Sequence, residues 1–419
     1  MLDERGAVIK NLKTQFLSFP KTFRVLIFST FIDRLGGGIM FPFLSLFVAQ
    51  KFNVGMTQVG LIFGVWSASS LVGSMIGGAL ADKFGRKAVI IFGLISSAIS
   101  ALLMGFVNSI SSFYILALVA GIFSEVGHPA SQAMVADLLS VGKRAEGYGI
   151  LRVVANLSMT LGPIIGGVLA GYSFMLLFII DAVASSITAL IFLLAIPETK
   201  PERSEHEPSQ SVLQTIAGYA VVLKDKIFLA FIVASIIILF VYTQMYSTLS
   251  VFLYQVHGVS AQEFGLIMSM NAAMVVLFQF WITKRIKNHQ PLMMMILASA
   301  LYGIGFVLFG FVTTTAFFYI GMAIITLGEM VHIPVAQALA AFFAPEDMRG
   351  RYMAAYGLGW AIPSTFGPLL AGLVMDNYDP RWVWYLSGIL SVIAVMSFAL
   401  LLLKTQHRFV DYSASQELE

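Results

Sequence analysis

The sequence contains no cysteine, which excludes disulfide bonds, thiol catalysis and cysteine-ligated metal sites. Charged residues are also scarce. They make up 11% of the 419 residues, whereas about a quarter is usual for a soluble protein. Hydrophobic residues account for 58%. A water-soluble globule could not cover its surface with so few charges, so the sequence predicts that lipid surrounds most of the chain.

Several chemical signatures are missing as well. The sequence has no G-x-x-x-x-G-K-[ST] loop for nucleotide phosphates. It shows no convincing Ser-His-Asp or metal-hydrolase spacing and no second polar domain. We therefore expect no enzyme activity, no cofactor, no resident metal and no nucleic-acid partner.

Long apolar runs alternate with short polar segments. A bilayer-crossing helix needs about 20 apolar residues, and division at the polar segments predicts an all-α protein with twelve spans. The one long polar segment, ETKPERSEHEPSQ at 198–210, indicates a linker between two six-helix bundles. The predicted spans are 23–50, 57–80, 88–108, 111–138, 144–172, 174–196, 227–256, 262–283, 291–311, 315–343, 349–376 and 382–403. The predicted parts are an N-terminal segment 1–22, bundles 23–196 and 227–403, a linker 197–226 and a tail 404–419.

The basic residues favour one orientation. With both termini on the same side, 21 of the 25 Lys and Arg residues fall on that side. Only Lys51 and Arg381 fall on the opposite side, while Arg34 and Arg152 lie within spans. Because basic loops stay in the cytoplasm, we expect a multi-pass protein of the cell membrane whose termini and linker are cytoplasmic.

The two halves resemble each other in sequence. A constant shift of 205 residues aligns Leu44 with Leu249 and Ser45 with Ser250, and, much further along, Gly162 with Gly367. An even number of helices separates the copies, so both have the same orientation. The sequence therefore predicts two pseudo-symmetric bundles related by an axis along the membrane normal.

The turn between spans 2 and 3 reads GGALADKFGRK at 77–87 and is unusually rich in glycine and charge. Glycine permits tight turns and close backbone approach, and an Asp at a helix boundary can meet the positive end of another helix. We interpret the turn as a conformational latch, although an ordinary basic turn remains the alternative. The latch residues are Gly78, Asp82, Gly85, Arg86 and Lys87.

The spacing G-x-x-x-D-K-x-G-R-K at 78–87 resembles the signature loop of the major facilitator superfamily, and the resemblance extends over nearly the whole chain. It implies the major facilitator fold, with spans 1, 4, 7 and 10 around a central cavity and substrate moved by alternating access. It also implies a small-molecule substrate. Because the nucleotide loop is missing, we expect the proton gradient to drive transport, and we expect a monomer in the bilayer.

A second pattern in span 5 is similar to the antiporter motif of proton-coupled drug exporters in that superfamily. Ser158 stands where the motif has a further glycine. Small residues let helices pack backbone to backbone, and proline bends a helix; generic small-residue packing is the alternative interpretation. The motif residues are Gly149, Ser158, Gly162, Pro163, Gly166 and Gly167.

Span 1 adds a third likeness. DRLGGGIMFP at 33–42 resembles the first helix of tetracycline/proton antiporters, in which an Asp precedes a Pro by nine residues. The arginine that many drug antiporters carry in span 4 would fall near Ala117, so Arg34 or Arg152 would have to supply that cation.

Ionisable residues inside spans are costly and therefore mark functional sites. We predict proton coupling at Asp33, Glu125 and Glu329. Asp33 lies at a depth similar to that of Arg152 and could pair with it or with Arg34, either as a proton-sensitive switch or as a static salt bridge. We interpret Asp181 as a helix-packing residue only.

Two Glu-x-x-His pairs, Glu125 with His128 and Glu329 with His332, place each His on the face of its Glu. The shift of 205 aligns Glu125 with Met330, so the pairs are not perfect mirrors. We favour proton carriage or substrate contact over a di-iron centre, which needs further carboxylates. The histidines could equally bond their own Glu or a backbone carbonyl.

Aromatic residues with polar edges suit a lipophilic, cationic molecule. The candidate cavity residues are Arg34, His128, Arg152, Tyr242, Tyr246, His332, Tyr356 and Trp360. The predicted function is proton-driven export of lipophilic drug-like molecules. The alternatives are a proton symporter or uniporter for a sugar, an organic anion or another metabolite, and a membrane receptor or enzyme that has lost transport.

Overall fold

The computed structural model describes residues 17–200, 222, 224–345 and 348–416. The regular secondary structure of these residues is helical throughout, and they include twelve helices that are long and apolar enough to cross a membrane. The predicted all-α membrane fold is therefore confirmed. The predicted N-terminal segment up to residue 16 and most of the predicted linker lie outside the described residues.

The chain divides into two compact units. Unit 1 consists of Met1–Phe41 and Ala68–Ser204, and unit 2 of Pro42–Ser67 and Glu205–Glu419. Residues 42–67 thus pack with unit 2, although the sequence repeat places them in the first half of the chain.

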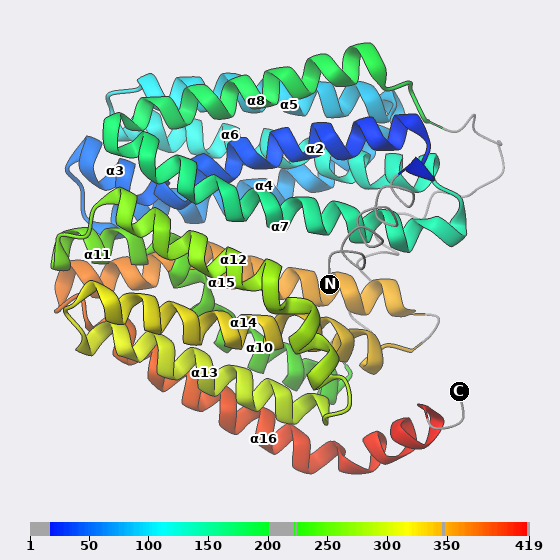
Figure 1. Cartoon of the computed structure of the whole chain (residues 1–419), viewed down its shortest axis with the longest axis vertical. Coiled ribbons are helices and arrows are strands. Elements are labelled where there is room, and N and C mark those ends of the chain that lie inside the picture. The colour runs from blue at the N-terminus through cyan, green and yellow to red at the C-terminus, as the bar shows by residue number, and fades with distance from the viewer. Residues whose placement is uncertain (1–16, 201–221, 223, 346–347, 417–419) are drawn as a thin grey trace, which may run out of the picture. The chain divides into compact units, whose positions relative to one another are not determined.

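In unit 1, α2 lies between α7 and α8, and α5 packs against both α6 and α8 (Figure 1). The helices of this unit are α2 (Lys21–Met40), the second part of α4 (Met56–Phe84), α5 (Arg86–Phe106), α6 (Ile110–Leu138), α7 (Val141–Tyr172) and α8 (Phe174–Ala195).

Unit 2 repeats this arrangement: α10 packs against α15 and α16, and α13 packs against α14 and α16. Its helices are α3 (Leu44–Phe52), the first part of α4, α10 (Lys226–Ser247), α11 (Leu249–His257), α12 (Ala261–Ile286), α13 (Pro291–Phe311), α14 (Thr315–Phe343), α15 (Arg349–Asn377) and α16 (Trp382–Gln416). The helix α16 extends beyond the predicted end of its span at residue 403.

The predicted first and seventh spans are each broken in the structure. A short 3-10 helix, Phe41–Phe43, separates α2 from α3. It contains Pro42, which lacks the N–H that a continuous α-helix would need there. The seventh span breaks at Thr248, whose side chain donates to Gln244 Oε1 at 2.7 Å. A side chain that bonds locally in this way competes with the regular helix.

Residues 42–67 are held in unit 2 by polar contacts. Ser45 and Ser250, which the repeat aligns, hydrogen bond through their hydroxyls at 2.9 Å. The carboxylate of Asp376 on α15 caps α4, because it accepts from the backbone N–H groups of Met56 at 2.8 Å and Thr57 at 2.7 Å. Such a carboxylate satisfies free N–H groups and interacts favourably with the helix dipole.

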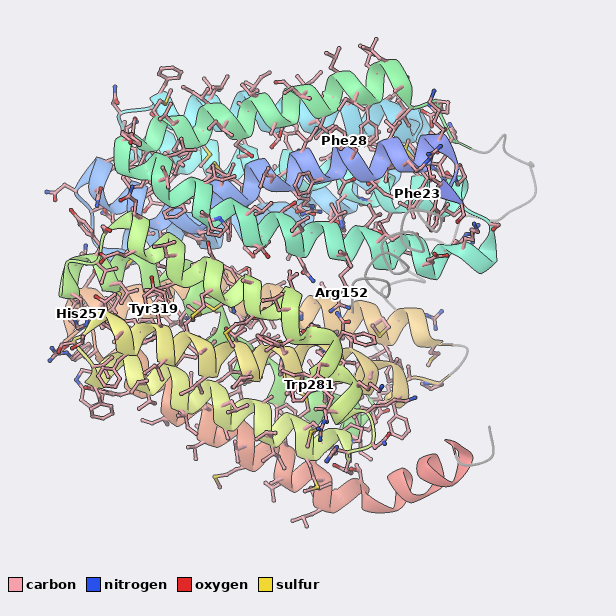
Figure 2. The ribbon with its side chains drawn as sticks, viewed as in Figure 1. Phe23, Phe28, Arg152, His257, Trp281 and Tyr319 are labelled. Carbon is pink, nitrogen blue, oxygen red and sulfur yellow. The ribbon has the colours of Figure 1, made fainter. Side chains whose placement is uncertain are left out.

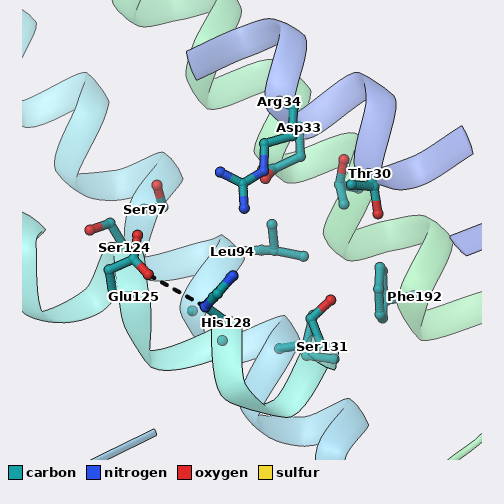
Figure 3. A pocket seen from close by; sticks show the side chains of 14 residues that line it. Thr30, Asp33, Arg34, Leu94, Ser97, Ser124, Glu125, His128, Ser131 and Phe192 are labelled. Carbon is teal, nitrogen blue, oxygen red and sulfur yellow. Dashed lines mark ion pairs between the residues drawn. The ribbon is translucent and has the colours of Figure 1, made fainter. Parts of the chain in front are cut away.

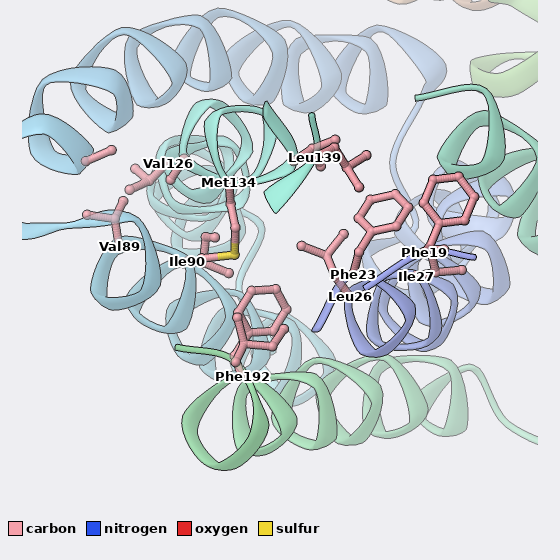
Figure 4. Packing of buried hydrophobic residues seen from close by; sticks show 14 residues of the cluster. Phe19, Phe23, Leu26, Ile27, Val89, Ile90, Val126, Met134, Leu139 and Phe192 are labelled. Atoms are coloured by element: carbon pink, nitrogen blue, oxygen red, sulfur yellow. The ribbon is translucent and has the colours of Figure 1, made fainter. Parts of the chain in front are cut away.

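One end of unit 1 contains a dense apolar cluster (Figure 4). Phe23 is fully buried in it, whereas Phe28, five residues further along α2, is 59% exposed (Figure 2). Exposed apolar side chains of this kind suit contact with lipid tails. The other members of the cluster are Phe19, Leu26, Ile27, Ala81, Val89, Ile90, Val126, Ala130, Met134, Val135, Leu139, Phe192 and Ile196.

Candidate functional site

Unit 1 contains a pocket of about 130 Å³ among α2, α5, α6 and α8 (Figure 3). Four of the predicted residues line it together: Asp33, Arg34, Glu125 and His128. Hydroxyl groups complete its polar wall, from Thr30, Ser97, Ser124, Ser131 and Thr188. A pocket with these groups can bind polar or charged atoms and can pass protons.

Asp33 interacts differently from the prediction. Its carboxylate accepts a hydrogen bond from Ser185 on α8 at 3.1 Å. Among the described residues it forms no ion pair with an arginine within 4.0 Å, although Arg34 lines the same pocket. Arg152, on α7, is exposed and does not line this pocket (Figure 2). Asp33 is therefore held by a neutral hydroxyl and is influenced by Arg34 only at a distance.

Glu125 and His128 share one face of α6, as predicted. His128 Nδ1 lies 3.9 Å from Glu125 Oε2, and the dashed line in Figure 3 marks this pair. The other ring nitrogen of His128 lies 3.3 Å from Gln132 Nε2. Both side chains of the pair are about two-fifths exposed, at 40% for Glu125 and 43% for His128, so solvent or substrate can reach them.

Glu329 is the centre of a buried polar cluster in unit 2. One carboxylate oxygen accepts from the Tyr242 hydroxyl at 2.9 Å, and the other accepts from Asn271 Nδ2 at 2.8 Å. Asn271 also donates to Thr326 Oγ1 at 2.9 Å. Three helices, α10, α12 and α14, thus converge on one carboxyl group, which would be costly to bury without partners.

Most of the predicted aromatic residues surround this carboxyl group. The hydroxyls of Tyr242 and Tyr246 lie 3.4 Å apart. The ring of Trp360 meets that of Tyr242 edge to face, with centroids 5.9 Å apart. Tyr356 stacks on Phe231, with ring centroids 6.2 Å apart, and its side chain also interacts with Trp360.

His332 is buried beside the cluster, but neither of its ring nitrogens has a hydrogen-bond partner among the described residues. It therefore bonds neither Glu329 nor a backbone carbonyl, which were the two partners expected. Its ring lies 5.7 Å from that of Tyr302, whose hydroxyl is also buried without a partner. Buried polar groups without partners mark a place where water or a ligand can bind.

The glycine-rich turn holds its charged residues within unit 1. Arg86 Nε lies 3.3 Å from Asp137 on α6, and Arg86 Nη1 lies 3.5 Å from Asp82, whose side chain is 67% exposed. Gly78 has open space where a Cβ would stand, so it makes no close approach. The glycine that does is Gly77, because a Cβ there would meet the carbonyl of Val126.

Gly85 and Glu198 form the turn itself. Gly85 has φ +98°, and a Cβ on it would meet the Glu198 carboxylate. That carboxylate caps α5, because it accepts from the backbone N–H groups of Arg86 at 2.8 Å and Lys87 at 3.1 Å. Lys87 Nζ in turn donates to the carbonyl of Leu193 at 2.9 Å. The turn and the end of α8 are thus one connected structure.

We expect Glu198→Gln to lower the melting temperature at neutral pH by about 1–3 °C, the size of a lost helix cap. Partial burial opposes ionisation of Glu198, but backbone N–H donors from Lys200, Arg86, Thr199 and Lys87 outweigh it and lower its pKa. The cap therefore stabilises the fold fully above the unfolded-state pKa of about 4.3. This stabilisation is lost as the pH falls through the lower pKa of the folded state. Melting curves of both proteins at pH 7 and pH 4 test this, and an equal difference at both pH values would contradict it.

The small residues of α7 pack against α2. A Cβ on Gly162 would meet the backbone of Gly38, and a Cβ on Gly38 would lie 2.9 Å from the carbonyl oxygen of Ser158. The Ser158 hydroxyl donates to the carbonyls of Val154 and Phe31. Pro163, Gly166 and Gly167 are also buried, whereas Gly149 has open space around it. Backbone-to-backbone packing thus occurs at Ser158 and Gly162 but not at Gly149.

A family model matches nearly all of the chain. Residues 26–364 and 331–417 match the model of the Major Facilitator Superfamily. The chain belongs to the major facilitator superfamily. Members of this family are membrane transporters and not enzymes, which agrees with the twelve spans and with the expected absence of catalytic motifs.

Curated relatives and a solved structure agree with this assignment. A Na⁺, Li⁺, K⁺/H⁺ antiporter of Planococcus maritimus is 25% identical over 379 residues, which cover 83% of this chain and 88% of the relative. Multidrug resistance protein 1 of Bacillus subtilis (strain 168) is 22% identical over 379 residues, which cover 89% of this chain and 94% of the relative. The crystal structure of a mutant of the nucleoside transporter NupG matches with a TM-score of 0.81 at 15% identity. The match covers 91% of this chain and 100% of the NupG chain, and at this identity it shows a shared fold alone.

Sequence reasoning missed several residues of these sites. Asn271 is an uncharged residue within a span, and a search restricted to ionisable groups passes over it. Ser185 and Tyr302 carry no pattern, because only the packing of helices brings them to Asp33 and His332. Glu198 lies in the predicted linker at 197–226, yet it caps α5.

Proposed function

We propose that this chain is a proton-coupled transporter that exports lipophilic small molecules by alternating access. The observation that carries the proposal is Glu329, a carboxyl group buried within a span and held by two hydrogen-bond donors from two other helices. A carboxyl group in such a setting can exist with or without its proton, and the change of charge alters its bonds to Tyr242 and Asn271. Protonation is thereby linked to the packing of three helices.

Three aromatic residues around Glu329 support a lipophilic substrate. Tyr242, Tyr246 and Trp360 offer ring faces and hydroxyl edges in one place. Aromatic faces attract organic cations, and a nearby carboxylate adds to that attraction. The named activities of the multidrug and cation/proton relatives are compatible with exchange of a cation for protons.

A second candidate function is proton symport or uniport of a polar metabolite. The pocket of unit 1 favours it, since Arg34 and His128 line that pocket together with several hydroxyl groups. Because Asp33 and Glu125 line the same wall, it suits an uncharged hydrogen-bonding metabolite such as a sugar better than a lipophilic molecule.

We further propose that the protein is a monomer in the cell membrane with both termini in the cytoplasm. This orientation places the turn at 77–87 on the cytoplasmic side. Its support is the distribution of Lys and Arg along the sequence.

Transport in liposomes tests the function. Purified protein is reconstituted, a pH gradient of either sign is imposed, and lipophilic cationic dyes and polar metabolites are followed along with internal pH. We expect dye movement opposite to proton movement in the wild type, and reduced exchange in Asp33→Asn, Glu125→Gln and Glu329→Gln. Co-movement of a metabolite with protons would select the second candidate. Normal proton exchange in all three variants would refute the assignment of these carboxyl groups.

A further inference from the structure

Asp181 on α8 is a buried carboxyl group that the pocket of unit 1 does not include. It is 7% exposed and makes no hydrogen bond with any described residue. A Cβ on Gly36 of α2 would lie 3.0 Å from Asp181 Oδ1 and 2.8 Å from the Cβ of Ala184. The carboxyl group therefore lies at the contact between α2 and α8, close to Gly36.

The two helices run antiparallel, and the contacts between them place Asp181 near Asp33. The hydroxyl of Thr188 donates to the carbonyl of Ser29 at 3.2 Å, and Ser185 donates to Asp33 at 3.1 Å. The contact of Gly36 with Asp181 comes next along the same interface. Asp181 precedes Ser185 by four residues, so both lie on the face of α8 that meets α2.

Few other charges are near this interface. Arg34 follows Asp33 on α2 and lines the pocket, as do Glu125 and His128 on α6. On α7, which also packs against α2, the ionisable residue at this depth is Arg152, which is exposed. The α5 helix carries charge only at its start, and Asp181 is the sole charged residue of α8. No cation pairs with Asp181 among the described residues.

We propose that Asp181 is a second proton-binding residue of the transporter and shares a proton with Asp33. Two carboxylates in one low-dielectric interface repel each other, so they do not both ionise readily. Asp33 lines the polar pocket and Asp181 does not. Asp181 therefore exchanges protons with the pocket through Asp33, whose carboxylate accepts from the Ser185 hydroxyl on the same face of α8. This inference rests on the proposed proton coupling and adds a residue to it.

Infrared difference spectroscopy tests the pair directly, through the absorption band of a protonated carboxylic acid during a pH titration. The proteins are the wild type, Asp33→Asn, Asp181→Asn and the double variant, all reconstituted in lipid. We expect the titration midpoint of Asp33 to differ by about one pH unit or more between the wild type and Asp181→Asn. The same midpoint in both proteins would overturn the proposal.

Two further variants separate coupling from folding. Ser185→Ala removes the hydroxyl that donates to Asp33 and measures the effect of that hydrogen bond alone. The reciprocal measurement, the midpoint of Asp181 in the wild type and in Asp33→Asn, should show the same difference and keeps the test decisive if Asp181→Asn does not fold. Ser186→Ala, on the exposed face of α8, removes a hydroxyl that donates to the carbonyl of Ala182 and should leave the midpoint unchanged. A midpoint that follows the sodium concentration would identify a cation site and overturn the shared proton.

The spectra also distinguish this proposal from the proposed function. Proton-driven transport with independent titration of Asp33 and Asp181 would refute the shared proton alone. Coupled titration in a protein that moves no substrate against protons would refute the transport function and leave the carboxyl pair standing.

Discussion

Glu329→Gln is expected to abolish transport driven by a pH gradient, down to the background of protein-free liposomes. Glutamine keeps the size of the side chain and one acceptor oxygen for Asn271 Nδ2, and its own Nε2 can donate to the oxygen of the Tyr242 hydroxyl, but it cannot release a proton. Exchange of labelled for unlabelled substrate at equal pH needs no net proton movement and should persist. Gradient-driven uptake and equilibrium exchange are therefore measured side by side in the same preparation.

Glu263→Gln is the matched control for this variant. Glu263 lies in the first turn of α12, where it forms a capping box with Ser260 and has no contact with the buried cluster. We expect Glu263→Gln to show the same gradient-driven uptake and the same equilibrium exchange as the wild type. Gradient-driven uptake that survives in Glu329→Gln would show that another group carries the proton. Loss of both activities would show damage to the binding site and not to coupling alone.

Gly162→Ala is expected to destabilise the protein strongly, because the added methyl group would meet the backbone of Gly38 on α2. Overpacking in a well-packed interior costs on the order of 1–3 kcal/mol, and here neither backbone can rotate away as a side chain would. In a membrane, helices associate largely through such close packing. We expect a lower yield of monodisperse protein and a melting temperature several degrees below that of the wild type.

Gly149→Ala provides a control on the same helix. A Cβ at that position has open space around it, and alanine favours a helix over glycine by about 1 kcal/mol. The melting temperature should therefore stay the same or rise. Equal melting temperatures for the two variants would contradict the importance of the contact between Gly38 and Gly162.

The spans could be predicted from the sequence because the apolar runs are long and the membrane fixes their length. Glu329 could be predicted for a related reason, since a charge within such a run is rare and costly. The sequence repeat also aligned Ser45 with Ser250, which hydrogen bond to each other. In each case the signal lies along the chain itself.

The partners of these residues could not be predicted in the same way. Asp33 accepts a hydrogen bond from Ser185 and forms no ion pair with an arginine, because Ser185 is the residue of α8 that lies opposite Asp33. Gly77, and not the predicted Gly78, packs closely against α6. Which of two neighbouring residues faces α6 depends on how α4 is rotated about its own axis. Rotations and contacts between helices leave no periodic trace that a single sequence reveals.

The packing of residues 42–67 with unit 2 affects what the linker does. The chain passes between the units at 41/42 and at 67/68 as well as at 204/205. The second of these crossings lies inside the continuous helix α4, and Asp376 holds the start of that helix. Severing the linker would therefore not yield two independent pieces, because the amino-terminal fragment would still carry a segment whose hydrogen-bond partners belong to the other fragment.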